Sequence, residues 1–329
     1  MRTADPLLND YQQSFPLLSS PFATLGARHG LSEDEVLGRY GRWQAEGVVS
    51  RIGAVLAPHR VGTSTLAALA VPPERLAEVA GWVSALAEIN HNYERENHYN
   101  LWFVATAPDQ PHLDAVLADI ARRSGCPLLV LPMVESYHID LGFNLAGPRA
   151  DRALRAAVPV GSAPRLPLSE RGRALLGVLQ EGLPLVAQPY QTLARQLGCT
   201  EVTLLADIAR WQEEGVVKRF GVVVRHRELG YAANAMCVWQ VPEEQISAIG
   251  QQLAAEGAVS LCYHRRPAGS DWPYNLYCML HGQARQAVLA THADLNARLG
   301  LAAWPQAVLF SGECFKQRGA CYQPGRAAA

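Results

Sequence analysis

The sequence predicts an α+β fold: a tandem repeat in which a winged helix-turn-helix unit is followed, twice, by a ferredoxin-like αβ domain. Three observations predict it. The segment RWQAEGVV at 42–49 recurs as RWQEEGVV at 210–217, an offset of 210 − 42 = 168. Other matches follow in the same order in both halves, among them YNL at 99–101 and 274–276. Each half also has the pattern of strands and helices in the order β-α-β-β-α-β. An ordered series of matches indicates an internal duplication.

Each copy begins with short helices that end in the RWQxEGVV segment, where the glycine is a plausible helix C-cap and the two valines start a strand. In copy one this strand runs through 51–56. A second strand leads into a helix that opens on prolines, and two strands, another helix and a last strand close the unit. The expected ranges are strands 66–71 and 235–241, strands 99–105 and 274–280, and helices 112–123 and 284–299.

The repeat also predicts the domain boundaries. Helix-turn-helix-like domains are expected at 1–52 and 168–220, and ferredoxin-like domains at 53–147 and 221–329. A linker rich in Pro, Ala and Arg is expected at 148–167. A ferredoxin-like sheet has helices on one face only, so two copies can pack their bare faces together.

Composition excludes several classes of protein. The net charge of −1 argues against non-specific attraction to DNA or anionic lipid. The sequence has no run of about 18 apolar residues, so no membrane helix is expected. The first residues do not resemble a secretory signal. The seven cysteines are scattered without a CxxC pair. They indicate a reducing, cytoplasmic environment and no structural zinc.

The helix-turn-helix units lack the residues of a DNA reader, which needs Lys or Arg near its recognition helix. The helix of copy one opens with Ser32, Glu33, Asp34 and Glu35, whose charge repels phosphate. Its counterpart opens at Thr200 with no base nearby. We therefore expect no DNA binding, and interpret these units as retained structural or dimerising elements.

Polar residues gather in three segments of copy two, which the ferredoxin-like order places at a strand end, at the β-β connection and beyond the last strand. Guanidinium groups suit carboxylates and aromatic rings suit a flat ligand. Phosphate is disfavoured because no P-loop or GxGxxG precedes a helix. We therefore expect a flat ligand rich in carboxylates. The residues concerned are Arg225, His226 and Arg227, then Tyr263, His264, Arg265, Arg266, Trp272 and Tyr274, then Lys316 and Arg318.

Three motifs in this order resemble one subunit type of siroheme decarboxylase: RFGVVVRHRELGY at 219–231, WPYNLYCMLHG at 272–282 and FKQRG at 315–319. The copy-one motifs RWQAEGVVSRIGAV, HYNLWFV and SYHIDLGF resemble the partner subunit type. The architecture resembles that of Lrp/AsnC regulators. The resemblance covers nearly the whole chain. It implies a fused two-subunit enzyme that removes two acetate carboxyl groups of siroheme as carbon dioxide, giving didecarboxysiroheme in haem d1 or alternative haem biosynthesis.

The resemblance also implies partners and roles. Siroheme would serve as its own electron sink, so no further cofactor is expected, and its iron is part of the substrate. A homodimer through the Lrp/AsnC-like domains is expected. His226 and His264 are the candidate proton donors, and either could instead be the axial ligand of the siroheme iron. With Arg265 they form the expected catalytic set. The expected substrate-binding residues are Arg225, Arg227, Tyr263, Arg266, Trp272, Tyr274, Lys316, Arg318, Arg95, His98 and His138.

Copy one has Pro58 and Glu94 where copy two has His226 and His264, so one working pocket is expected, in copy two. Other interpretations stay open at this point. His226 could be a solvated loop residue, and His264 with Arg265 could form a surface salt bridge. Asn100 and Asn275 could only satisfy backbone groups at strand ends. A haem-sensing or siroheme-sensing Lrp/AsnC-type regulator without turnover is the rival function.

Overall fold

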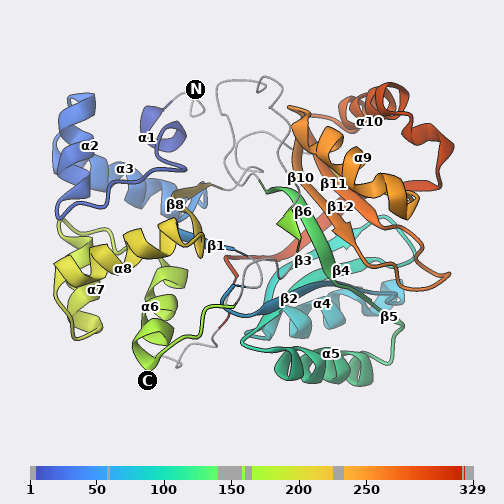
Figure 1. Cartoon of the computed structure of the whole chain (residues 1–329), viewed down its shortest axis with the longest axis horizontal. Helices are drawn as coiled ribbons and strands as arrows, with labels where there is room; N and C mark the ends of the chain where they lie inside the picture. Colours follow the sequence, from blue (N-terminus) through green and yellow to red (C-terminus); the bar gives the residue numbers. More distant parts are fainter. Residues whose placement is uncertain are drawn as a thin grey trace.

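The computed structural model describes residues 5–57, 60–139, 158–159, 165–224, 233–320 and 322. One part of the molecule holds the helix-turn-helix units of both copies, and the other holds the ferredoxin-like domains of both copies (Figure 1). Segments that are distant in sequence therefore lie together in each part. No helix in the described ranges combines the length and the apolar character needed to cross a membrane.

The helical part is built from matching helices of the two copies. Copy one contributes α1 (Pro6–Asn9), α2 (Pro21–His29) and α3 (Glu33–Ala45), and copy two contributes α6 (Glu170–Glu181), α7 (Pro189–Gln196) and α8 (Glu201–Glu213). Both expected N-caps are present. The Ser32 hydroxyl accepts from the Glu35 amide in a capping box, and the Thr200 hydroxyl accepts from the Thr203 amide. The acidic first turns therefore stabilise these helices.

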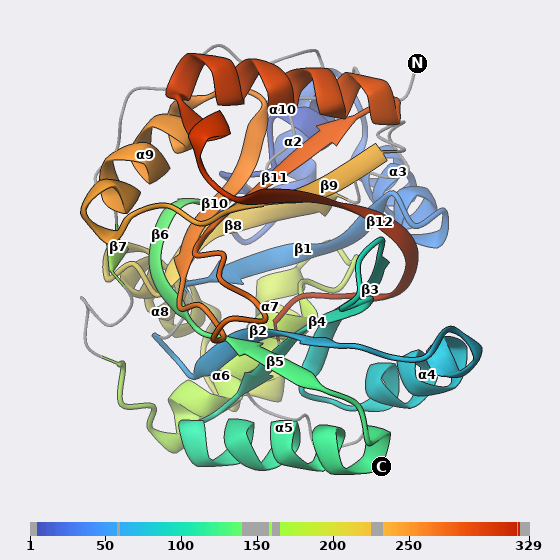
Figure 2. The same cartoon turned by 90° about the vertical axis from the view of Figure 1, so that its right-hand side faces the viewer.

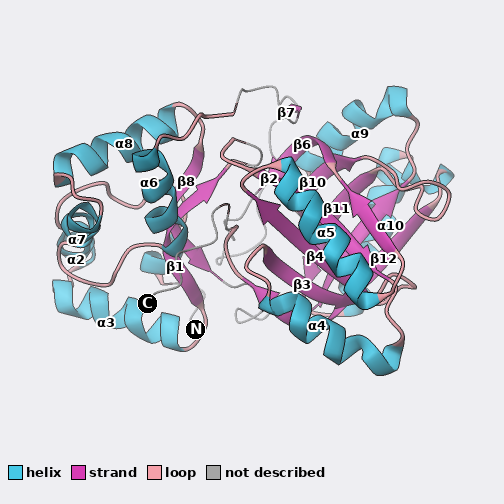
Figure 3. Cartoon of the chain, turned by 90° about the horizontal axis from the view of Figure 1, so that it is seen from below, coloured by secondary structure: helices cyan, strands magenta, loops and turns pink. Residues whose placement is uncertain are grey.

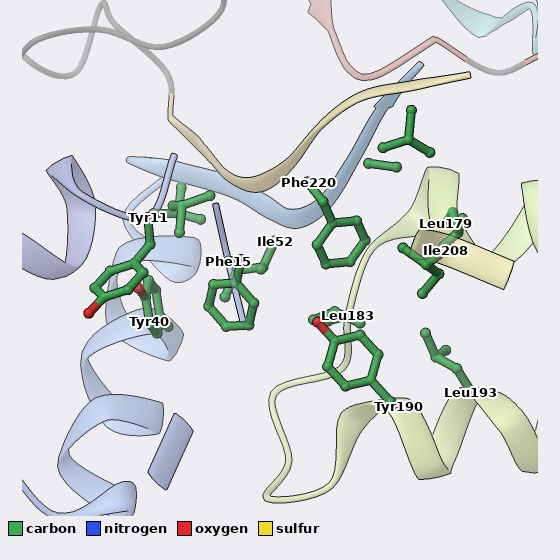
Figure 4. Packing of buried hydrophobic residues seen from close by; sticks show 14 of the residues in the cluster. Tyr11, Phe15, Tyr40, Ile52, Leu179, Leu183, Tyr190, Leu193, Ile208 and Phe220 are labelled. Carbon is green, nitrogen blue, oxygen red and sulfur yellow. The ribbon is translucent and has the colours of Figure 1, made fainter. Parts of the chain in front are cut away.

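The first strand of each copy forms a two-stranded sheet with its counterpart, here called the wing ribbon: β1 (Val49–Leu56) and β8 (Val217–Val224), antiparallel, with Gly53 opposite Gly221. The predicted domain boundaries at 52 and 220 fall inside these two strands. Aromatic residues of both copies share one cluster on the same side of the ribbon: Phe15 and Tyr40 come from copy one, and Tyr190 and Phe220, the latter a residue of β8, come from copy two (Figure 4). The Tyr190 hydroxyl also donates to the Pro16 carbonyl, 2.8 Å away, so the two units share one core.

The other part holds ten strands in the order β5-β2-β4-β3-β12-β9-β11-β10-β6-β7. The strands of copy one are β2 (Thr63–Leu69), β3 (Ile89–Arg95), β4 (Leu101–Ala107), β5 (Leu128–Leu131) and β6 (Met133–Ile139), followed by the short β7 (Val158–Pro159). The strands of copy two are β9 (Ala233–Trp239), β10 (Val259–Arg265), β11 (Leu276–Gly282) and β12 (Gln306–Gln317). All of the expected ferredoxin-like strands are present in the expected order.

The last strand of each copy crosses to the other copy. In copy one, β5 pairs with β2 of its own sheet, and after Pro132 the chain continues as β6, which pairs with β10 of copy two. In copy two, residues 306–310 of β12 pair with β9, and residues 311–317 pair with β3 of copy one. The expectation that this strand closes its own unit is therefore only half correct. Hydrophobic alternation marks a strand but does not specify its partner.

Helices cover the two outer faces of this strand layer. Copy one contributes α4 (Leu76–Ala85), after a 3₁₀ turn at Pro73–Arg75, and α5 (Gln110–Ser124). Copy two contributes α9 (Glu243–Ala255) and α10 (Arg285–Leu299), with a 3₁₀ turn at Leu301–Ala303. The strands lie between the two helix pairs (Figures 2 and 3). Trp102 and Leu131 of copy one share an apolar cluster with Met236 and Tyr277 of copy two, which confirms that the bare faces pack together.

The two YNL asparagines have the structural role that was left open. The Asn100 side chain bonds both backbone groups of Val71, at 3.0 and 2.8 Å. Asn275 does the same with Val241, at 2.8 and 2.7 Å. These side chains hold the start of one central strand to the end of its neighbour.

Candidate active site

A cavity of about 380 Å³ lies between the inner faces of the two sheets. Copy one contributes residues of β2, β3 and β4, and copy two contributes residues of β9, β10 and β11. Residues of the wing ribbon and of the segment after β12 complete the lining, among them Arg51, Val224 and Tyr322. The helix-turn-helix part therefore supplies one wall of the cavity.

The lining repeats itself across the cavity. Tyr93 and Arg95 of β3 correspond to Tyr263 and Arg265 of β10, and Trp102 of β4 corresponds to Tyr277 of β11. The single pocket within copy two that the sequence suggested is therefore replaced by one cavity shared by both copies. The physical reason is that the bare sheet faces oppose each other, so that any space between them belongs to both.

The charge of the lining is one-sided. The described lining residues include four arginines, Arg51, Arg95, Arg265 and Arg318, and two histidines, His91 and His281, but no Asp or Glu. The whole chain has 29 Lys and Arg against 30 Asp and Glu, so this excess is local. Aromatic rings lie beside two of the arginines: Tyr93 beside Arg95, and Tyr263 and Tyr277 beside Arg265. Such a lining suits a flat ligand with several carboxylates.

Arg95 and Arg265 hold the crossing strands in place. Arg95 Nη1 donates to the Leu309 carbonyl at 3.1 Å, and Arg265 Nη1 donates to the Leu131 carbonyl at 2.9 Å. Each bond joins the two copies: Leu309 lies on β12, which crosses between them, and Leu131 ends β5, just before the crossing strand β6 begins. The Arg265 guanidinium also lies 5.2 Å from the Tyr263 ring centroid, and its burial lowers its pKa. These two arginines are fixed parts of the wall.

His91 is a cavity residue of β3 with no counterpart in copy two, where Leu261 has its place. Burial and the neighbouring Arg51 charge together lower the pKa of His91 to about 4. The imidazole is therefore neutral at pH 7 in the empty protein. Anionic ligand carboxylates would raise its pKa again and favour the imidazolium.

This lowered pKa predicts a pH-dependent stability. The unfolded chain has a histidine pKa near 6.5 and so binds more protons than the native state between pH 6.5 and about 4. Stability from His91 is therefore complete above pH 6.5 and is lost as the pH falls through that window. Urea unfolding at several pH values should show a shallower fall for His91→Gln than for the wild type. If the free energy of unfolding had the same pH dependence in both proteins, the lowered pKa of His91 would be contradicted. His264 and His292, whose pKa values are also lowered, contribute equally to the wild type and to His91→Gln.

His264 lies on the other face of β10. Its Nε2 is 3.9 Å from Glu243 Oε2 on α9, and the neighbouring same-face residue Cys262 bonds the Gly250 carbonyl of that helix. Tyr263 and Arg265, which alternate with them, face the cavity. The structure therefore argues against His264 as the proton donor here. Burial also raises the pKa of the Cys262 thiol, so that residue is no nucleophile.

The other predicted site residues divide into two groups. Tyr263, Arg265, Arg318 and Arg95 line the cavity, whereas Arg266 and His98 are exposed. Trp272 is buried between the sheets, where its Nε1 donates to the Tyr277 hydroxyl at 2.7 Å, and Tyr274 packs against it. Lys316 Nζ donates to the Leu86 carbonyl at 2.9 Å at the end of α4, a structural role. His138 lies on β6, opposite Cys262, and is not among the lining residues.

Arg225, His226, Arg227 and Pro58 lie outside the described residues. Val223 and Val224, which precede the first three directly, line the cavity. Sequence reasoning did not assign His91, Arg51 and His281 to the site. A signal existed for two of them, because His91 faces Leu261 and His281 faces Thr106 when the two copies are aligned.

The fold and cavity define a class: a helix-turn-helix protein whose paired αβ domains enclose an arginine-rich cavity. The family described as "AsnC-like ligand binding domain" matches residues 60–138 and 228–316. The family described as "Siroheme decarboxylase NirDL-like HTH domain" matches residues 5–49 and 172–217. The chain belongs to the siroheme decarboxylase family of the fused NirDL type.

Individual relatives agree with this membership. The siroheme decarboxylase NirDL subunit of Paracoccus denitrificans is 41% identical over 314 residues, which is 95% of each chain. The siroheme decarboxylase NirD subunit of Pseudomonas aeruginosa is 52% identical over 143 residues, 44% of this chain and 95% of that protein. The crystal structure of siroheme decarboxylase NirDL in complex with an iron-uroporphyrin III analogue has 28% identity and a TM-score of 0.71, covering 97% of this chain and 94% of that one.

Proposed function

We propose that this chain is a siroheme decarboxylase that removes two acetate carboxyl groups of siroheme as carbon dioxide, giving didecarboxysiroheme for haem d1 or alternative haem biosynthesis. The observation that carries the proposal is the shared cavity, which combines four arginines and several aromatic rings with no acidic residue among its described lining. A flat macrocycle with a carboxylate on each side chain matches that lining in shape and in charge.

For this decarboxylation the protein must supply a proton donor and hold the substrate ring in a fixed orientation. When a ring carbon beside the acetate-bearing position is protonated, the electrons of the breaking carbon–carbon bond can flow into the macrocycle as carbon dioxide leaves. The exocyclic carbon then takes a proton and becomes a methyl group while the ring carbon gives up the proton that it received, so that each acetate lost as carbon dioxide consumes one proton. The macrocycle is the electron sink, so no cofactor beyond the substrate is needed, and the iron belongs to the substrate.

We assign the proton donation to histidine. His91 is the donor that the cavity geometry supports, and His226, two residues beyond the cavity-lining Val224, stays a second proposed donor or the axial ligand of the siroheme iron. Cavity arginines are proposed to bind carboxylates that do not react. A guanidinium paired with the departing carboxylate would stabilise the ground state and slow the loss of carbon dioxide.

We also propose a cytoplasmic homodimer that does not bind DNA. The described cysteines are all free, which is typical of a reducing compartment. The two sheets of one chain already cover each other's inner faces, so a second chain would have to use outer surfaces.

One experiment tests the function. Purified full-length chain is incubated anaerobically with siroheme, and the tetrapyrrole mass and released carbon dioxide are followed. The expected result is a product that has lost two carboxyl groups, because the ring would be held in the cavity beside the proposed proton donor. Boiled protein is the control for spontaneous loss. Tight siroheme binding without any change in mass would instead identify a sensor.

A further inference from the structure

Arg51 differs from Arg95 and Arg265, two other arginines of the cavity lining, in the hydrogen bonds that its guanidinium makes. Arg95 and Arg265 each bond a carbonyl of the opposite copy and so join the two copies. Among the described residues, the Arg51 guanidinium donates only from Nη2 to the Ala54 carbonyl of its own strand, at 3.0 Å. Its Nε is buried and has no hydrogen-bond partner among the described residues. This guanidinium therefore brings a half-buried positive charge into the cavity, and within the described ranges it makes no hydrogen bond to copy two.

Burying a charge without a counter-ion costs free energy, so the position of the Arg51 guanidinium needs an explanation. Two glycines leave space for this side chain in the cavity. A β-carbon on Gly182 would come within 3.0 Å of Arg51 Cβ, and one on Gly319 would come within 2.5 Å of Arg51 Nη1. Two glycines thus make room for the stem and for the guanidinium.

The repeat supplies an internal comparison. Arg219 occupies the position in copy two that Arg51 occupies in copy one, at the offset 219 − 51 = 168. It donates to the Gln12 carbonyl in the N-terminal segment, and it is not among the cavity-lining residues. The wing ribbon therefore does not require an arginine in the cavity, and the placement of Arg51 is specific to copy one.

We propose that Arg51 is a substrate-anchoring residue supplied by the wing ribbon, which binds a carboxylate of the tetrapyrrole that the reaction retains. The guanidinium fork matches a carboxylate, and the ligand would provide the counter-charge that the described lining lacks. The helix-turn-helix part then acts by orienting the substrate rather than by reading DNA. This inference rests on the proposed function and extends it to a residue of that part.

Arg51→Met tests the proposal because it keeps most of the stem and removes the charge. The matched control is Arg219→Met in the same ribbon. Affinity is measured by absorbance titration with iron-uroporphyrin III, which needs no turnover, and KM and kcat are measured with siroheme. We expect Arg51→Met to raise Kd and KM about 10–100-fold with little change in kcat, since it removes a charged hydrogen bond made throughout the reaction. Arg219→Met should keep the wild-type Kd.

Thermal unfolding of the empty protein separates anchoring from a structural role. Removing a half-buried charge that has no acidic partner among the described residues should leave the unfolding midpoint of Arg51→Met at or above that of the wild type. A Kd within twofold of the wild type overturns the proposal, and so does weaker binding accompanied by a markedly lower midpoint. If the wild type binds iron-uroporphyrin III but does not decarboxylate siroheme, the proposed function fails while the Kd comparison still decides the role of Arg51.

Discussion

Replacing His91 with glutamine is expected to lower the rate of siroheme decarboxylation by about 10²–10⁴-fold, the usual contribution of a general acid. His91 is the cavity histidine whose neighbour is Arg51, and its pKa of about 4 keeps it neutral while the cavity is empty. The carboxylates of a bound substrate would raise the pKa of His91 and so favour its protonated form beside the ring. Single-turnover product mass at pH 7, with saturating siroheme, measures the effect directly.

Two further histidine variants serve as comparisons for His91→Gln. His264→Gln changes a histidine beneath α9, on the opposite face of β10, and is expected to keep substantial turnover. His226→Gln examines the second proposed donor, and a loss of rate there together with a loss in His91→Gln would assign both histidines to the reaction. Full turnover by His91→Gln together with inactivity of His264→Gln would contradict the cavity assignment. Siroheme binding by each variant controls for misfolding.

The sequence predicted the helices and strands well because each element is determined mainly by residues within it and at its ends. The RWQxEGVV segment, with its glycine, correctly placed the start of the first strand in each copy. The expected strand 99–105 is observed as Leu101–Ala107, and the expected helix 112–123 as Gln110–Ser124. The bare sheet faces were expected to pack together, and they do. Periodicity and capping residues carry this information within a few residues of each element.

The site was predicted less well because its geometry depends on tertiary pairing. Strand alternation places Tyr263 and Arg265 on one face of β10 and His264 on the other, but it does not reveal which face meets the cavity. The crossing of β6 and β12 between copies is also absent from any local pattern. Arg51 belongs to a strand that the sequence assigned correctly, yet its role depends on β1 lying beside the sheets. Only the assembled wing ribbon brings it there.

Gly250→Ala should disturb the crossing that builds the cavity. Gly250 lies on α9, and a β-carbon there would overlap the ring of Tyr137, a residue of the copy-one strand β6. Tyr137 is buried, and its hydroxyl donates to Glu135 at 2.8 Å, so the ring has little room to move. Overpacking of this kind costs about 1–3 kcal/mol. Urea unfolding of the full chain measures the loss.

Gly81→Ala is the matched control, since Gly81 is also a helical glycine and a β-carbon there meets nothing within 4 Å. That change should stabilise the protein by about 0.4–1 kcal/mol through the unfolded state. Opposite signs for two identical substitutions would show that the contact with Tyr137, and not helix propensity, decides the outcome. Because β6 is the strand that copy one gives to the copy-two sheet, Gly250→Ala should also weaken iron-uroporphyrin III binding. Unchanged stability in Gly250→Ala would mean that the crossing strand tolerates displacement, and that the cavity wall is less rigidly fixed than the Arg265 and Leu131 bond implies.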